Sequence, residues 1–96
     1  MANTIPNITV QPDTVTNIYT DAGVVAAGII VGNQINVAMI GQGDAQLYAG
    51  PTPPAKIDNT SGYRDLKSNE ESSNDAGDTG AFIFSLLGCT INVKAV

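Results

Sequence analysis

The chain has 96 residues, with nine acidic and four basic side chains and a net charge of −5 at pH 7. This length is that of a single domain, and the charge argues against binding to nucleic acid or to an anionic membrane, because both need clustered Lys and Arg. With no His and only one Cys, the sequence excludes a disulfide-stapled module and lacks the commonest catalytic base. We therefore expect a protein that is not an enzyme, holds no cofactor and works through its surface.

The first thirteen residues, 1–13, are expected to form an extended arm, because Pro6 and Pro12 disfavour a helix around them. The remainder, 14–96, is expected to form a single β-domain. The apolar side chains of the arm are candidate partner-binding residues that would lie against a neighbouring subunit: Ile5, Ile8 and Val10.

The next part of the chain predicts a strand followed by a hairpin. Thr14–Thr20 is rich in β-branched residues and predicts a first strand. Val24–Val31 is ambiguous, because its two alanines favour a helix while Val and Ile at both ends favour a strand; we expect a strand with a bulge at Gly28. Gln34–Ile40 alternates apolar and small or polar residues and predicts a strand that pairs with Val24–Val31.

The second half predicts short strands separated by long loops. A Pro-rich loop is expected over 50–62 and a polar, acidic loop over 68–80. Tyr63–Lys67, between these loops, is predicted to be an edge strand. The predicted strands of this half are Ala45–Ala49, Tyr63–Lys67, Ala81–Leu87 and Thr90–Val96. About seven short strands bounded by turn residues are typical of a small β-sandwich or a jelly-roll-like barrel. We therefore expect an all-β fold.

The acidic loop is the one candidate metal site. Its carboxylates are weak Ca²⁺ candidates, because hard oxygen ligands on a Gly-containing loop suit this ion: Glu70, Glu71, Asp75 and Asp78. The ligand spacing of an EF-hand loop is absent, so a solvated loop without metal is the favoured interpretation.

Other chemistry-bearing side chains are few. Cys89 lies between two apolar runs and is expected to be a small buried filler, because nothing nearby in the sequence would lower its pKa. Tyr19, Tyr48 and Tyr63 could stack on sugars or on a partner, although a half-buried tyrosine on a strand is the simpler interpretation.

The order of short motifs resembles small virion structural proteins of tailed bacteriophages. The residues that carry the resemblance lie within about 14–95: Gln46-Leu47-Tyr48-Ala49-Gly50, the following Pro51-Thr52-Pro53-Pro54, Gly62-Tyr63, Asp75-Ala76-Gly77, Gly80-Ala81-Phe82-Ile83-Phe84-Ser85 and Thr90-Ile91-Asn92-Val93. Phe82 and Phe84 stand where that group often has a Trp. The resemblance implies an all-β domain displayed on a virus particle and carries over no catalytic residue.

Within that group, the small size, the low charge and the apolar N-terminal arm favour a capsid decoration (cement) protein. It would stabilise the phage head over junctions of the major capsid protein, as a homo-oligomer for which a trimer is expected. A tail, baseplate or fibre-anchoring protein is the alternative, and a carbohydrate- or Ca²⁺-binding β-module is a further one. We expect assembly in the host cytoplasm and location in the virion. No leader or membrane anchor is expected, since the longest apolar stretch, Ala22–Gly32, falls short of the roughly 20 residues of a membrane span.

Overall fold

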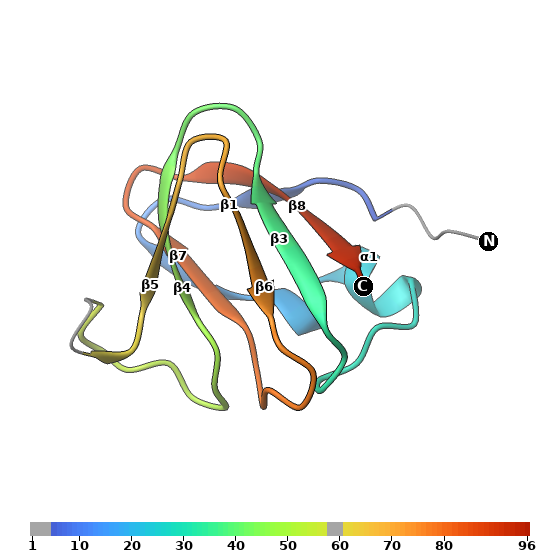
Figure 1. Ribbon diagram of the computed structural model, residues 1–96. Coiled ribbons are helices and arrows are strands. Elements are labelled where there is room, and N and C mark those ends of the chain that lie inside the picture. The colour runs from blue at the N-terminus through green and yellow to red at the C-terminus, as the bar shows by residue number, and fades with distance from the viewer. Residues whose placement is uncertain (1–4, 58–60) are drawn as a thin grey trace.

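A computed structural model describes residues 5–57 and 61–96 and has two antiparallel four-stranded sheets packed face to face (Figure 1). One sheet has the strand order β1-β8-β3-β6 and the other β2-β7-β4-β5. The strands are β1 (Ile8–Val10), β2 (Thr14–Asn17), β3 (Ile35–Met39), β4 (Asp44–Tyr48), β5 (Arg64–Lys67), β6 (Glu71–Asn74), β7 (Phe82–Ser85) and β8 (Cys89–Ala95). The prediction of an all-β sandwich is confirmed.

The core lies between the two sheets and is filled from alternate strand positions. Side chains that point inward are nearly all aliphatic, and the largest fully buried ones include Ile35, Val37, Leu47, Leu66, Ile83, Ile91 and Val93. Each fully buried side chain of this size contributes about 1.5–3 kcal/mol relative to its exposed state. The period-two pattern that predicted strands over Gln34–Ile40 and Thr90–Val96 therefore also identifies their buried faces.

The described part of the segment predicted as an extended arm, residues 5–13, includes a strand of the sandwich. β1 pairs antiparallel with β8, and Ile8 lies opposite Ile91. Ile5, Ile8 and Val10 are buried in the core cluster of their own chain, so these candidate partner-binding side chains are not on its surface. The reason is the alternation of Ile8 and Val10 around exposed Thr9, which suits a strand with one buried face. Residues 1–4 of the predicted arm lie outside the described residues.

The predicted strand over Val24–Val31 is wrong, and so is its hairpin. A short 3-10 helix, η1 (Ile18–Thr20), and the helix α1 (Ala22–Ala26) occupy this region, and β3 pairs with β6 and β8 instead. The Asp21 carboxylate accepts hydrogen bonds from the first backbone N–H groups of α1 and caps it. Gly28, at a φ of 81°, turns the chain away after the helix. In the described parts of the chain, no helix has the length and apolar character to cross a membrane.

The acidic loop predicted over 68–80 contains a strand, which is a second correction. β6 pairs with β3 along its length although Glu71-Ser72-Ser73-Asn74 has no apolar alternation. Tyr63–Lys67 is confirmed as an edge strand, because β5 ends its sheet. Arg64 Nη2 donates a hydrogen bond to the Ser73 carbonyl oxygen at 3.0 Å, so the two edge strands are linked across the side of the sandwich.

The core position of β1 predicts a specific loss of stability. Replacing Ile8 with Ala removes a buried side chain and leaves a cavity, so we expect the free energy of unfolding to fall by about 2–4 kcal/mol. Chemical denaturation measures this loss. The matched control is Thr9→Ala, on the exposed face of the same strand, which should change stability by less than about 0.5 kcal/mol. Equal effects of the two changes would show that β1 does not contribute to the core.

Candidate functional site

The outward faces of the two sheets differ in chemistry. On the sheet β1-β8-β3-β6, the outward positions carry mostly polar or small side chains: Thr9, Asn36, Ala38, Glu71, Ser73, Thr90, Asn92 and Lys94. This is the usual arrangement of an antiparallel sheet with one buried and one solvated face. This face therefore has the composition of a solvent-exposed surface.

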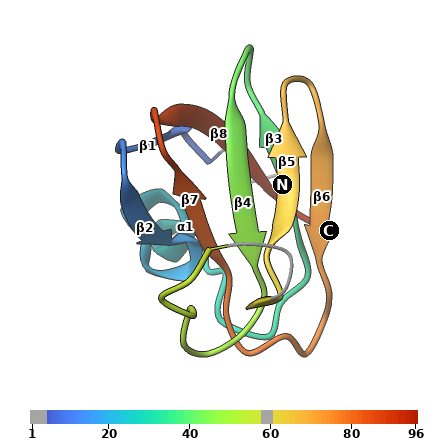
Figure 2. The ribbon, with the colours of Figure 1, turned by 90° about the vertical axis from the view of Figure 1, so that its left-hand side faces the viewer.

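The outward face of the sheet β2-β7-β4-β5 is apolar in its middle. Phe84 lies between Val15 on β2 and Gln46 on β4, and Phe82 lies beside Tyr48 in the next row of the same face. The rings of Phe82, Phe84 and Tyr48 are half-buried, and Val15 is 37% exposed. Figure 2 shows the four strands of this sheet side by side. A sheet face with this composition departs from the alternation expected for a solvated surface.

The turn that leaves this face is strongly apolar and projects into solvent. Leu86 and Leu87, which we call the leucine turn, follow β7 and are 62% and 87% exposed. Gly88, at a φ of 84°, allows the tight return into β8, and its N–H donates to the Ser85 carbonyl oxygen. The leucine turn is therefore held at a fixed place at the end of the apolar face.

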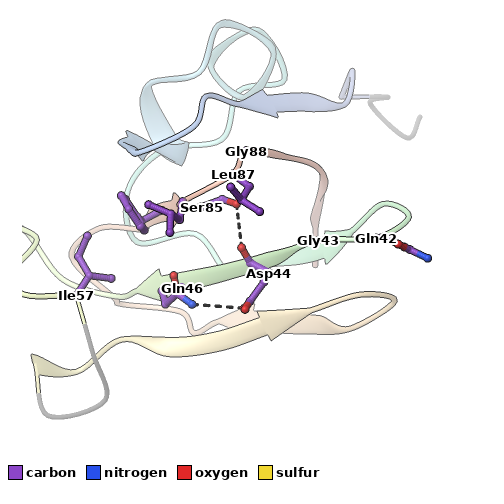
Figure 3. A pocket seen from close by; sticks show the side chains of 10 residues that line it. Gln42, Gly43, Asp44, Gln46, Ile57, Ser85, Leu87 and Gly88 are labelled. Atoms are coloured by element: carbon purple, nitrogen blue, oxygen red, sulfur yellow. Dashed lines mark hydrogen bonds between the residues drawn. The ribbon is translucent and has the colours of Figure 1, made fainter.

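A groove of about 650 Å³ runs along this face beside the leucine turn (Figure 3). We call it the outward groove. Its lining comes from β4, β7, the turns that flank them and the Pro-rich loop: Gln42, Gly43, Asp44, Gln46, Ile57, Phe84, Ser85, Leu86, Leu87 and Gly88. The groove thus combines an apolar wall with a polar floor along β4.

Hydrogen bonds fix the floor of the outward groove. The buried Ser85 hydroxyl donates to the Asp44 carbonyl oxygen at 2.9 Å and joins β7 to β4 beyond the last paired residues. The Asp44 carboxylate lies 3.5 Å from Lys67 Nζ. Both charges are exposed, so this ion pair contributes little to stability. The groove is therefore positioned by backbone and core contacts rather than by surface charge.

The predicted Ca²⁺ candidates are engaged in local turns. Glu70 Oε1 accepts a hydrogen bond from the Lys67 N–H at 2.6 Å, and Asp78 Oδ2 accepts one from the Asp75 N–H at 2.9 Å. Glu71 lies on the exposed face of β6. Among residues 5–57 and 61–96, no three acidic, His or Cys side chains lie together as a metal site would require. The Glu70 and Asp78 carboxylates therefore shape the turns around β6.

Two of the three tyrosines are unavailable for stacking on a ligand. Tyr19 and Tyr63 are only 4% and 3% exposed. Tyr48 is half-buried, with its ring centroid 5.3 Å from that of Tyr63. Cys89 is half-buried against the core, and burial raises the pKa of its thiol, which disfavours the reactive thiolate.

A buried polar pair that the sequence did not indicate joins η1 to β6. The Tyr19 hydroxyl donates to the Asn33 carbonyl oxygen at 2.6 Å and accepts from Asn74 Nδ2 at 3.0 Å. Asn74 is fully buried. Burial raises the pKa of Tyr19, the hydrogen bond from Asn74 lowers it by a smaller amount, and the Asp78 charge raises it further. A polar residue in a short strand gives no sequence signal of such a contact.

The Tyr19 contacts predict a pH-dependent stability. Because the folded-state pKa of Tyr19 lies above its ordinary value of 10.0, the neutral form is favoured on folding, and stability is lost as the pH rises past about 10. Tyr19→Phe leaves the Asn74 amide without its acceptor and should lower the free energy of unfolding by about 1–3 kcal/mol at neutral pH. Denaturation at pH 7 and pH 11 measures both effects, and the high-pH loss should be smaller in the variant. Identical pH profiles would contradict the assignment.

Because the Glu70 and Asp78 carboxylates accept backbone hydrogen bonds, we expect calcium to leave the thermal stability of the protein unchanged. With Ca²⁺ at roughly 2 mM, a concentration that fills even weak protein sites, we expect the same melting temperature as in EDTA. A ligand that binds only the folded state would raise it. A rise of several degrees that Asp78→Asn abolishes would show that the loop binds the ion.

A scan against protein-family models, a search of the curated proteins and a search of the solved structures each found no match.

Proposed function

We propose that the chain is a non-enzymatic structural protein of a tailed-phage particle, a decoration protein that binds over junctions of major capsid subunits and stabilises the head. The observation that carries the proposal is the exposed apolar surface at two separate places on a small, weakly charged domain. The short motifs that resemble phage virion proteins give the class of particle.

The first apolar place is the outward face of β2-β7-β4-β5 with the leucine turn. The second, which we call the α1 surface, comprises Val25 at 58%, Ile30 at 68% and Val31 at 51% exposure. In Figure 1, α1 lies on the right-hand side of the domain and the turn from β7 to β8 on the left-hand side. A protein that joins neighbouring copies and also binds a shell needs two such surfaces.

The mechanism is mechanical. Each specific contact with the shell needs about 1,200 Å² of total buried area or more, and every leucine-sized side chain that it covers adds about 1.5–3 kcal/mol. With only 14% charged residues, the contacts should be mainly apolar. They should therefore persist at high salt, which screens exposed charge pairs but not apolar burial.

The number of copies per particle tests the proposal. Quantitative mass spectrometry of purified particles of the phage that encodes the chain should give a copy number close to that of the major capsid protein. A wash in about 1 M salt, where screening is nearly complete, should not release the chain from the particles. A few copies per particle would place the chain in the tail, baseplate or fibres instead. Absence from the particles would overturn the proposal.

A further inference from the structure

The leucine turn and the outward groove lie side by side on one face of the domain. Leu86 and Leu87 form part of the groove wall and also project from it, with exposures of 62% and 87%. The same surface therefore carries a protruding apolar element and a recess of about 650 Å³. A patch that contains both allows the protruding element of one copy to enter the recess of a second copy.

We infer that the leucine turn of one copy packs into the outward groove of a second copy. The half-buried side chains of Phe84 and Ile57 supply apolar contacts for the incoming leucines. The inference goes beyond the proposed function, because it concerns association of the free chain in solution.

Charge favours this surface for self-association. Each copy carries a net charge of −5, so most close approaches of two copies bring like charges together. The segment Ser85–Cys89 carries no acidic or basic residue, and the acidic residue that lines the groove, Asp44, lies 3.5 Å from Lys67 Nζ. The leucine turn therefore adds no charge to the repulsion, and Lys67 offsets part of the Asp44 charge in the groove.

The size of the patch sets the expected affinity. A standard interface takes about 800 Å² from each partner, which is roughly 15% of the 5304 Å² surface of this chain. The groove is lined by ten residues, and Val15, Phe82 and Tyr48 extend the same face. This is fewer than the roughly 20 residues per side of a standard interface, so we expect association with a micromolar dissociation constant.

The edges at β2 and β6 are poor routes to association. β2 has only four residues, and the Asn17 carbonyl oxygen already accepts a hydrogen bond from the Thr20 hydroxyl. In the other sheet, the Ser73 carbonyl oxygen of the edge strand β6 accepts a hydrogen bond from Arg64. Short or partly blocked edges oppose pairing with a strand of another chain, which favours contact through side chains on the sheet face.

Sedimentation of the full chain tests the inference. Between about 1 µM and 1 mM, a range that spans micromolar association, the wild-type chain should pass from monomer to a dimer or a closed trimer. Leu87→Ser should weaken association at least about tenfold, since it removes the most exposed apolar side chain of the contact. Gln46→Trp, which fills the groove without changing the leucine turn, should weaken it as well.

The matched control is Val96→Ser, directly after the last residue of β8. Val96 is 71% exposed, a value between those of Leu86 and Leu87, so the change is chemically similar, and Val96 does not line the groove. It should leave association unchanged, and thermal unfolding should show that all three variants fold. A wild-type chain that stays monomeric at about 1 mM, or a Leu87→Ser chain that associates like wild type, would overturn the inference.

The same variants separate this inference from the proposed function. If association depends on Leu87 but the chain is absent from particles, the proposed function fails and the inference stands. If the chain decorates particles but is monomeric in solution at every concentration, the inference fails and the proposed function stands.

Discussion

The register of β7 is the constraint on which both the core and the candidate surface depend. Ile83 and Ser85 point inward and are almost completely buried, so Phe82 and Phe84 must point outward. A slip of one residue would bury the two rings and expose Ile83. The Ser85 hydroxyl opposes such a slip, because its hydrogen bond to the Asp44 carbonyl oxygen satisfies a buried polar group only in this register.

This arrangement gives the two sides of the sandwich different roles. The sheet β1-β8-β3-β6 buries a row of aliphatic side chains and presents a polar outer face, as a solvated sheet does. The sheet β2-β7-β4-β5 buries a similar row and yet keeps Phe82 and Phe84 on its outer face. Since the short or blocked strand edges disfavour strand addition, this face is the natural place for contact with another protein surface.

The sequence predicted the parts of the fold that are governed by a local period. Ile35, Val37 and Met39 in β3, and Ile91 and Val93 in β8, alternate with polar or small residues and are buried as that pattern indicates. The sequence failed where the element was too short to show its period: α1 has five residues, little more than one helical turn. It also failed at β6, because that strand has no apolar residue and is placed by pairing with β3.

The candidate site was less accessible to prediction than the fold. The outward groove brings Ile57 against residues of β7 and its following turn, and no local pattern reports which distant segments meet. Alternation along Ala81–Leu87 puts Phe82, Phe84 and Leu86 on one face of a strand, but this pattern does not show that the face points away from the core. The apolar residues of the first thirteen were predicted to lie against a neighbouring subunit, because no local pattern shows that β1 pairs with β8 from the other end of the chain.

Hydroxyl-radical footprinting tests the central claim, that the outward apolar face is covered in the working assembly. The leucine turn and the α1 surface would be compared between the dilute free chain and the chain on purified particles, with Thr9 and Thr90 on the polar sheet as the reference. Leu86 and Leu87 should react readily in the free chain and become protected on the particle, while the reference residues should change little. Equal reactivity of the leucine turn in both states would contradict the claim.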